Sequence, residues 1–150
     1  MTDRSGQAAA DLIGAWHLNS YESRDSSGAT RYPLGRGVIG QLVYDASGHM
    51  SAMLMTPDRP LFASQDPQRG TDAEVRAAFD GFIAYFGSYS VAPLTATVTH
   101  HVIGASYPNW VGGHQVRHYK LDGTHLELST PPIQIGGQSL ITVLVWERSS

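Results

Sequence analysis

Residues 114–130, HQVRHYKLDGTHLELST, decide the fold, because two alternating runs flank the pair Asp122-Gly123. An Asp-Gly pair between alternating runs is a strong short-range signal for a β-hairpin with a two-residue turn. Alternation with a period of two indicates strands that have one face toward a core and one face toward solvent. The stretch therefore predicts two antiparallel strands joined by a tight turn.

The register across this turn predicts which side chains point inward. Residues that lie directly opposite each other in a hairpin share a face of the sheet. The expected pairs are Leu121 with Thr124, Tyr119 with Leu126, Arg117 with Leu128, and Gln115 with Thr130. Leu126 and Leu128 alternate with polar residues, so their face is the inward one. Gln115, Arg117 and Tyr119 are expected on that face, whereas the outward face carries His114, His118 and Lys120.

On both sides of the hairpin, short alternating runs are separated by turn-forming residues. The strands we expect are residues 12–24, 38–44, 49–56, 85–91, 95–105, 115–121, 126–130 and 140–148. Sequential hairpins favour an all-β fold, an up-and-down antiparallel eight-stranded barrel, because closure removes exposed strand edges. A barrel of eight strands has room inside for side chains or for one small ligand.

One α-helix is expected between the strands. Residues 71–74, Thr-Asp-Ala-Glu, form a capping box, which marks the start of a helix. An apolar stripe at helical spacing follows, made of Val75, Phe79, Phe82, Ile83 and Phe86. The stripe predicts a helix that packs against the sheet and stops near Gly87, rather than a helix that binds a cofactor or crosses a membrane.

Composition limits the class of protein. The chain has 150 residues, 41% of them hydrophobic and 15% charged, which indicates one globular domain over residues 12–150 after a flexible tail over residues 1–11. A net charge of −3 gives no field that would attract nucleic acid or an anionic membrane. The chain has no cysteine, no apolar run of a signal peptide and none of a membrane span, so we expect a cytoplasmic protein.

A buried arginine is the feature that most needs a partner. Burying the Arg117 guanidinium is costly unless it is paired or hydrogen-bonded. Its partner could be Glu22, Asp80, a tyrosine, or a bound anionic or carbonyl-bearing ligand. The alternative is a purely structural strut at one end of the barrel.

His100 is the second candidate, since it shares a strand face with Val98 and Val102. A histidine in a cavity is a natural acid or base near neutral pH. The alternative is a core histidine that donates to a carbonyl or a tyrosine. His101 lies on the opposite face. The histidines alternate between inside and outside, so neither a metal nor a cofactor is predicted.

The loop between the two histidine-bearing strands reads Tyr107-Pro-Asn-Trp-Val-Gly-Gly113. Trp110 is expected to cap the mouth of the barrel or to plug its end, and Asn109 to brace the turn. Met53 belongs to a methionine-rich strand, which suits either an ordinary core or an adaptable apolar cavity.

Several short motifs occur in a consistent order along the chain. They are Gly14-Ala15-Trp16, Met50-Ser51, PDRP at 57–60, His100-His101, PNWVG at 108–112, Gln115-Val116-Arg117 and LSTPP at 128–132. Together these motifs resemble a bacterial lipocalin-like domain family of calycin-type eight-stranded barrels, over roughly residues 12–148. The resemblance implies an internal cavity. Related small barrels carry hydrophobic molecules, and some act as cofactor-free cyclases or isomerases. Arg148 is similar to the lipocalin arginine that packs over Trp16, which implies structural roles for both.

Two functions follow as hypotheses. The first is a monomeric or homodimeric barrel that binds a small, partly hydrophobic or aromatic molecule. The second is a cofactor-independent isomerase or cyclase of polyketide-like metabolism, in which His100 is the general acid or base and Arg117 stabilises an oxyanion or carboxylate. The ligand-binding residues we expect are Tyr85, Tyr89, His101, Asn109, Trp110, Gln115, Arg117, Tyr119 and Met53.

Overall fold

The computed structural model describes residues 4–135 and 137–149. Its strands are β1 (Gly14–Asp25), β2 (Thr30–Arg31), β3 (Ile39–Tyr44), β4 (His49–Met55), β5 (Phe82–Ala92), β6 (Thr97–Ala105), β7 (His114–Asp122), β8 (His125–Ser129), β9 (Ile133–Ile135) and β10 (Gln138–Arg148). Its helices are α1 (Arg4–Leu12) and α2 (Asp72–Asp80), with single 3-10 turns η1 (Pro67–Arg69) and η2 (Pro108–Trp110).

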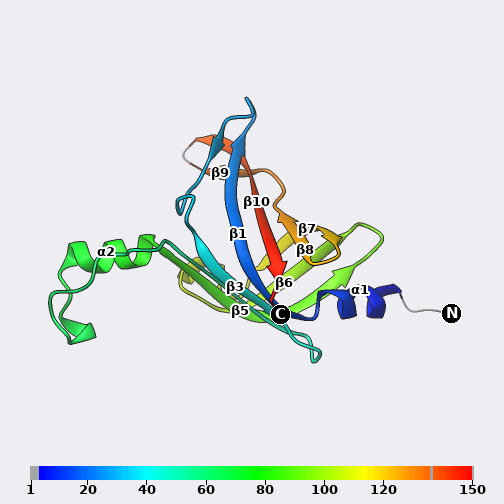
Figure 1. The fold of residues 1–150 in the computed structure, drawn as a ribbon, viewed down its shortest axis with the longest axis horizontal. Helices are drawn as coiled ribbons and strands as arrows, with labels where there is room; N and C mark the ends of the chain where they lie inside the picture. Colours follow the sequence, from blue (N-terminus) through cyan, green and yellow to red (C-terminus); the bar gives the residue numbers. More distant parts are fainter. Residues whose placement is uncertain (1–3, 136, 150) are drawn as a thin grey trace.

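Eight of these strands form a closed antiparallel barrel (Figure 1). The order around the barrel is β1-β3-β4-β5-β6-β7-β8-β10, and β10 pairs with β1 to close it. The short strands β2 and β9 extend β1 and β10 at one end. The predicted all-β, up-and-down eight-stranded barrel is therefore confirmed.

The β7–β8 hairpin has the predicted faces but not the predicted pairs. Tyr119 lies opposite Leu128, and Leu121 lies opposite Leu126, so the register differs by two residues from the expected one. The connecting residues are Gly123, which has a φ of 59°, and Thr124. Because side chains alternate with a period of two, a shift of two residues leaves every face unchanged. The pairs were wrong, and the inward face is confirmed.

Trp16 and Arg148 close one end of the barrel. The Trp16 side chain is fully buried, and its Nε1 donates to the carbonyl oxygen of Leu12 at 3.0 Å. The Arg148 guanidinium lies 4.2 Å from the centroid of the Trp16 indole. It also donates to the carbonyl oxygens of Ile13, at 2.7 Å, and Asp11, at 2.6 Å. The geometry implied by the lipocalin resemblance is confirmed.

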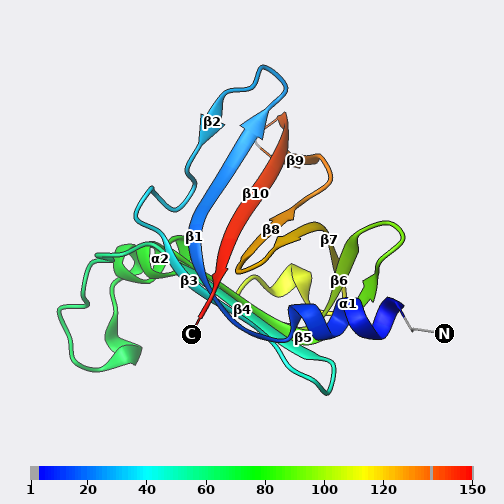
Figure 2. The same ribbon diagram turned by 45° about the vertical axis from the view of Figure 1, so that its right-hand side comes forward.

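Helix α1 lies beside this closed end (Figure 2). We expect a frayed tail there from the polar and small residues, and the structure has a helix instead. Its alanines, Ala8 to Ala10, favour helix, and the buried Leu12 anchors its last turn to the core. Residues 4–135 and 137–149 thus include two α-helices rather than the single predicted one.

Helix α2 is shorter than the apolar stripe predicts. The capping box of Thr71 and Glu74 is confirmed, but the helix ends at Asp80, and Phe82 begins β5. Val75 and Phe79 are 51% and 46% exposed, and Figure 1 shows α2 outside the barrel wall. The predicted helix is present, but the prediction that its apolar stripe packs against the sheet is wrong. Pairing with β4 and β6 satisfies the backbone from residue 82 onward and overrides the helical spacing. Neither of the described helices is long and apolar enough to cross a bilayer.

Candidate functional site

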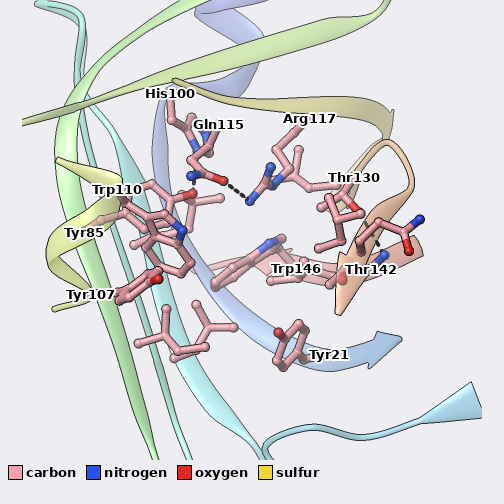
Figure 3. A pocket seen from close by; sticks show the side chains of 18 residues that line it. Tyr21, Tyr85, His100, Tyr107, Trp110, Gln115, Arg117, Thr130, Thr142 and Trp146 are labelled. Atoms are coloured by element: carbon pink, nitrogen blue, oxygen red, sulfur yellow. Dashed lines mark hydrogen bonds between the residues drawn. The ribbon is translucent and has the colours of Figure 1, made fainter. Parts of the chain in front are cut away.

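A cavity of about 610 Å³ lies inside the barrel (Figure 3). It is lined by Tyr21, Leu42, Ala52, Leu54, Ile83, Tyr85, His100, Tyr107, Trp110, Gln115, Arg117, Leu128, Thr130, Ile133, Gln134, Thr142, Leu144 and Trp146. The volume lies within the range of about 300–1,000 Å³ that is typical of small-molecule sites. A barrel filled solidly by side chains is thus excluded, and one small ligand has room.

Aromatic rings form one wall of the cavity. Trp110 meets Tyr85 edge-on, with ring centroids 6.0 Å apart, and meets Tyr107 edge-on at 5.4 Å. The turn η2 positions Trp110, because Val111 donates to the carbonyl of Pro108 and fixes the loop. Tyr107 is partly exposed to solvent. Trp110 therefore lines the mouth of the cavity and leaves the space below it open.

His100 lies at the inner end of the cavity between two tyrosines. Its side chain is only 1% exposed, which confirms the inward orientation. Tyr44 Oη lies 2.6 Å from its Nε2, and Tyr85 Oη lies 2.7 Å from its Nδ1. Burial first, and then the charge of Arg117, lower the pKa of His100 to about 3. The imidazole is therefore neutral at physiological pH, with both ring nitrogens engaged.

The depressed pKa of His100 predicts a loss of stability in acid. The folded-state pKa of about 3 is below the unfolded value of 6.5, so the unfolded chain binds the proton more tightly. The contribution of His100 to the free energy of unfolding should be complete above pH 6.5 and should decrease as the pH falls toward 3. The slope from this one group is at most about 1.4 kcal/mol per pH unit. Urea unfolding at several pH values measures it.

His100→Gln is the matched variant for this titration. It should give a flatter pH profile between 6.5 and about 4, whatever its stability at neutral pH. Hydrogen bonds lower the pKa of Asp25, Asp45 and Glu74, so these carboxylates are protonated at lower pH. Their effect on stability should be the same in the wild type and in His100→Gln. Identical slopes for wild type and variant would show that His100 is not buried as a neutral group.

Arg117 occupies the middle of the cavity wall. Its guanidinium donates to Gln115 Oε1 at 3.0 Å and to the carbonyl oxygen of Val116 at 2.9 Å. Glu22 instead binds Arg24, and Asp80 binds Arg76. Within the described part of the chain, no carboxylate lies within 4.0 Å of the Arg117 guanidinium. The cation is thus held by neutral groups only.

Trp146, on the opposite wall, has a free donor. Its side chain is 1% exposed, and its Nε1 has no hydrogen-bond partner among the described residues. Figure 3 shows the Trp146 indole across the cavity from Arg117. Nearby, Thr130 Oγ1 accepts from the backbone N–H of Thr142 at 2.9 Å. Arg117 and Trp146, which both line this cavity, therefore have N–H groups that could donate to a ligand.

The structure brings together five of the sequence-predicted residues along this cavity: Tyr85, His100, Trp110, Gln115 and Arg117. The other five predicted residues do not line this cavity, and their contact with a ligand stays a prediction. Met53, 37% exposed, and His101 point outward, because they alternate with the inward Leu54 and His100. Asn109 is exposed on the loop.

Tyr89 and Tyr119 do point inward but lie below the cavity. Tyr89 packs against Tyr44, with ring centroids 4.7 Å apart, and its hydroxyl donates to the carbonyl oxygen of Asp45. Tyr119 is partly buried against the core, and burial, followed by the charge of Asp11, raises the pKa of its hydroxyl. Both tyrosines belong to the packed floor.

Sequence reasoning missed several residues of the lining, above all Tyr21, Thr142 and Trp146. The alternation of Leu140, Thr142, Leu144 and Trp146 carried a signal for β10, because these are the inward residues of that strand. Nothing in the sequence indicated that Tyr21 would reach the cavity.

The outer histidines do not form a metal site. His101 Nδ1 lies 2.9 Å from His114 Nδ1, and His101 Nε2 lies 3.0 Å from Ser90 Oγ. Over residues 4–135 and 137–149, no three His, Asp or Glu side chains converge as metal ligands would.

These features define a barrel whose cavity is lined by aromatic side chains and by polar groups that could hold a ligand. The chain belongs to the lipocalin-like domain family, whose model matches residues 13–149. The predicted class, a lipocalin-like barrel that binds a small organic molecule in its cavity, is thereby confirmed. The bacterial source suggested by the resemblance stays a prediction.

Two comparisons add detail. The chain is 37% identical, over 106 residues, to the 4'-hydroxy-3'-methoxypropiophenone carrier protein ppsC of Aspergillus oryzae. The match covers 66% of this chain and 96% of that protein. Among solved structures, the REP1-NXSQ fatty acid transporter superposes with a TM-score of 0.43 and 11% identity, covering 94% of this chain and 98% of that one. A likeness at that level carries no functional argument.

Proposed function

We propose that this protein binds and carries a small aromatic ketone in the barrel cavity. The observation that carries the proposal is the lining itself: Tyr85, Trp110 and Trp146 offer aromatic surface beside the Arg117 guanidinium, for which the described residues provide no carboxylate. The similarity to a protein named as a carrier of an aryl ketone supports the same ligand class.

The chemistry of the lining fits such a ligand. An aromatic ring gains from edge-on and stacked contacts with tryptophan and tyrosine. A carbonyl oxygen can accept from a guanidinium or an indole N–H. A cavity of about 610 Å³ has room for one molecule of this size.

The alternative, a cofactor-independent isomerase or cyclase, receives less support. His100 and Arg117 do line one cavity, as that hypothesis requires. Both nitrogens of His100 are already bonded to tyrosines, and its pKa of about 3 makes it a weak base. A general base should instead have a pKa near the working pH and a nitrogen free to meet the ligand. The geometry of His100 therefore supports ligand binding better than it supports catalysis.

We also propose that the protein works in the cytoplasm as a monomer or homodimer, without nucleic acid or membrane as a partner. The net charge of −3 and the scattered basic residues support this. Light scattering during gel filtration measures the oligomeric state.

Calorimetric titration with 4'-hydroxy-3'-methoxypropiophenone tests the function. We expect one site per chain and a dissociation constant of about 1–100 μM, in keeping with a ligand of this size. Trp110→Ala should weaken binding about tenfold, because it removes an aromatic wall. Leu61→Ala removes an equally apolar side chain that is 92% exposed, and should change nothing. The absence of saturable binding at millimolar ligand would refute the proposal.

A further inference from the structure

Three hydrogen-bonded side chains connect the packed floor of the barrel to the cavity. Tyr44 Oη lies 2.6 Å from Nε2 of His100, and Tyr85 Oη lies 2.7 Å from Nδ1 of the same ring. Tyr44 is fully buried, whereas Tyr85 lines the cavity. The group thus links a fully buried tyrosine to a tyrosine that lines the cavity.

Either tautomer of His100 leaves one tyrosine O–H without an acceptor among the described residues: that of Tyr44, which is fully buried, or that of Tyr85, which lines the cavity. A neutral imidazole has one N–H donor and one acceptor nitrogen. With the proton on Nε2, His100 would donate to Tyr44, and the Tyr44 O–H would have no acceptor among the described residues. With the proton on Nδ1, Tyr44 donates to Nε2, and Nδ1–H donates to the Tyr85 oxygen. A buried donor without an acceptor is costly, so the Nδ1–H tautomer is favoured.

This tautomer decides what Tyr85 offers to a ligand. Because the Tyr85 oxygen already accepts from His100, its own proton remains available to the cavity. Burial lowers the pKa of His100, so the ring stays neutral and the direction of both hydrogen bonds is retained across the physiological pH range. Tyr85 is therefore a donor toward the ligand.

Two more residues of the lining, Arg117 and Trp146, carry N–H donors. The Arg117 guanidinium has five N–H groups and uses two of its nitrogens on Gln115 and Val116. Trp146 Nε1 is buried without a partner in the described part of the chain. None of the 18 lining residues is Asp or Glu. Such a lining is matched by a ligand group that accepts several hydrogen bonds and donates none.

We infer that the cavity contains a subsite for a carbonyl-type oxygen, in which Tyr85 is the specificity-determining donor beside Arg117 and Trp146. Tyr44 and His100 are positioning residues, which act by fixing the proton of Tyr85. The inference rests on the proposed function, because it names the chemical group through which the same cavity recognises its aromatic ligand. A ketone oxygen and a carboxylate oxygen share this chemistry, whereas a methylene group lacks it.

Three matched compounds separate these possibilities. They are 4'-hydroxypropiophenone, which has a ketone, 3-(4-hydroxyphenyl)propanoate, which has a carboxylate, and 4-propylphenol, which has neither. We expect 4'-hydroxypropiophenone or the propanoate to bind at least about tenfold more tightly than 4-propylphenol, since acceptor-deficient analogues leave buried donors unpaired. The tighter of the two identifies which acceptor the subsite prefers.

Variants test the role of each tyrosine. Tyr85→Phe should weaken binding of the preferred compound about fivefold to tenfold and leave the affinity for 4-propylphenol unchanged. Tyr44→Phe should lose part of the same preference, although Tyr44 does not touch the cavity. Tyr32→Phe, which removes a tyrosine hydroxyl outside the lining, is the control. A merely structural effect of Tyr44 would weaken all three compounds equally.

The tautomer itself can be read without a ligand. Long-range ¹H–¹⁵N correlation spectra of the full chain should show His100 protonated at Nδ1 and unprotonated at Nε2. The Nε2–H tautomer would overturn the inference, and so would equal affinities for the three compounds. In either case, a saturable cavity would leave the proposed function standing. If none of the three compounds binds, both the proposed function and the inference fail.

Discussion

Arg117→Met should weaken binding of 4'-hydroxy-3'-methoxypropiophenone about 10- to 100-fold. Hydrogen bonds to a charged group are worth about 1.5–3 kcal/mol, and Met retains the length and the apolar stem of the arginine. The guanidinium contacts Gln115 and Val116 within its own strand and no carboxylate within 4.0 Å among the described residues. Folding should therefore change little, by less than about 1 kcal/mol. Calorimetric titration and urea unfolding of the same preparation measure both quantities.

Arg69→Met is the matched control for the loss of one positive charge. Arg69 is largely exposed in η1 and pairs only with Asp66, so its replacement should alter neither binding nor stability measurably. If Arg117→Met unfolds the protein, the arginine is a structural strut. If it folds and binds normally, the cavity does not recognise its ligand through this cation.

Gly87→Ala should destabilise the barrel strongly, by about 2–4 kcal/mol. A Cβ at this position would lie 1.8 Å from the carbonyl oxygen of His101, which belongs to the backbone and cannot rotate away. The register of β5 against β6 shifts between Phe86 and Gly87, so Gly87 lies at a β-bulge in the wall. For a chain of 150 residues, the loss corresponds to a melting temperature lower by about 5–15 °C.

Gly37→Ala provides the control for the glycine replacement. A Cβ there would lie 3.4 Å from the Pro57 ring, an ordinary contact, so the unfolding free energy should change by less than about 1 kcal/mol. Equal melting temperatures for Gly87→Ala and wild type would mean that β5 and β6 separate freely at the bulge. The strand pairing that places His100 beside Tyr85 would then be in doubt.

The faces of the β7–β8 hairpin were predictable from the sequence because they depend only on parity. The Asp-Gly signal displaced the turn by one residue, and the register by two, yet Gln115 and Arg117 remained inward. The same logic identified His100 rather than His101 as the buried histidine. Motif order supported the lipocalin-like family, and the closed barrel followed from sequential hairpins.

Depth along the barrel was not predictable, since it depends on strand stagger rather than on alternation. Tyr89 and Tyr119 share the inward face with cavity residues, but they lie in the packed floor. The helix boundary failed for a different reason. Phe82, Ile83 and Phe86 fit a helical stripe as well as a strand, and only pairing with β4 decides between them. That Trp146 Nε1 has no hydrogen-bond partner among the described residues follows only from the three-dimensional structure.

Ligand-induced changes at the three tryptophan side chains test the central claim most directly. Trp110 and Trp146 line the cavity, whereas Trp16 is fully buried at the closed end with its Nε1 bonded to Leu12. Addition of 4'-hydroxy-3'-methoxypropiophenone to ¹⁵N-labelled protein should shift the indole signals of Trp110 and Trp146 in a saturable way and leave that of Trp16 in place. Unchanged spectra, or a shift confined to Trp16, would contradict binding inside the barrel.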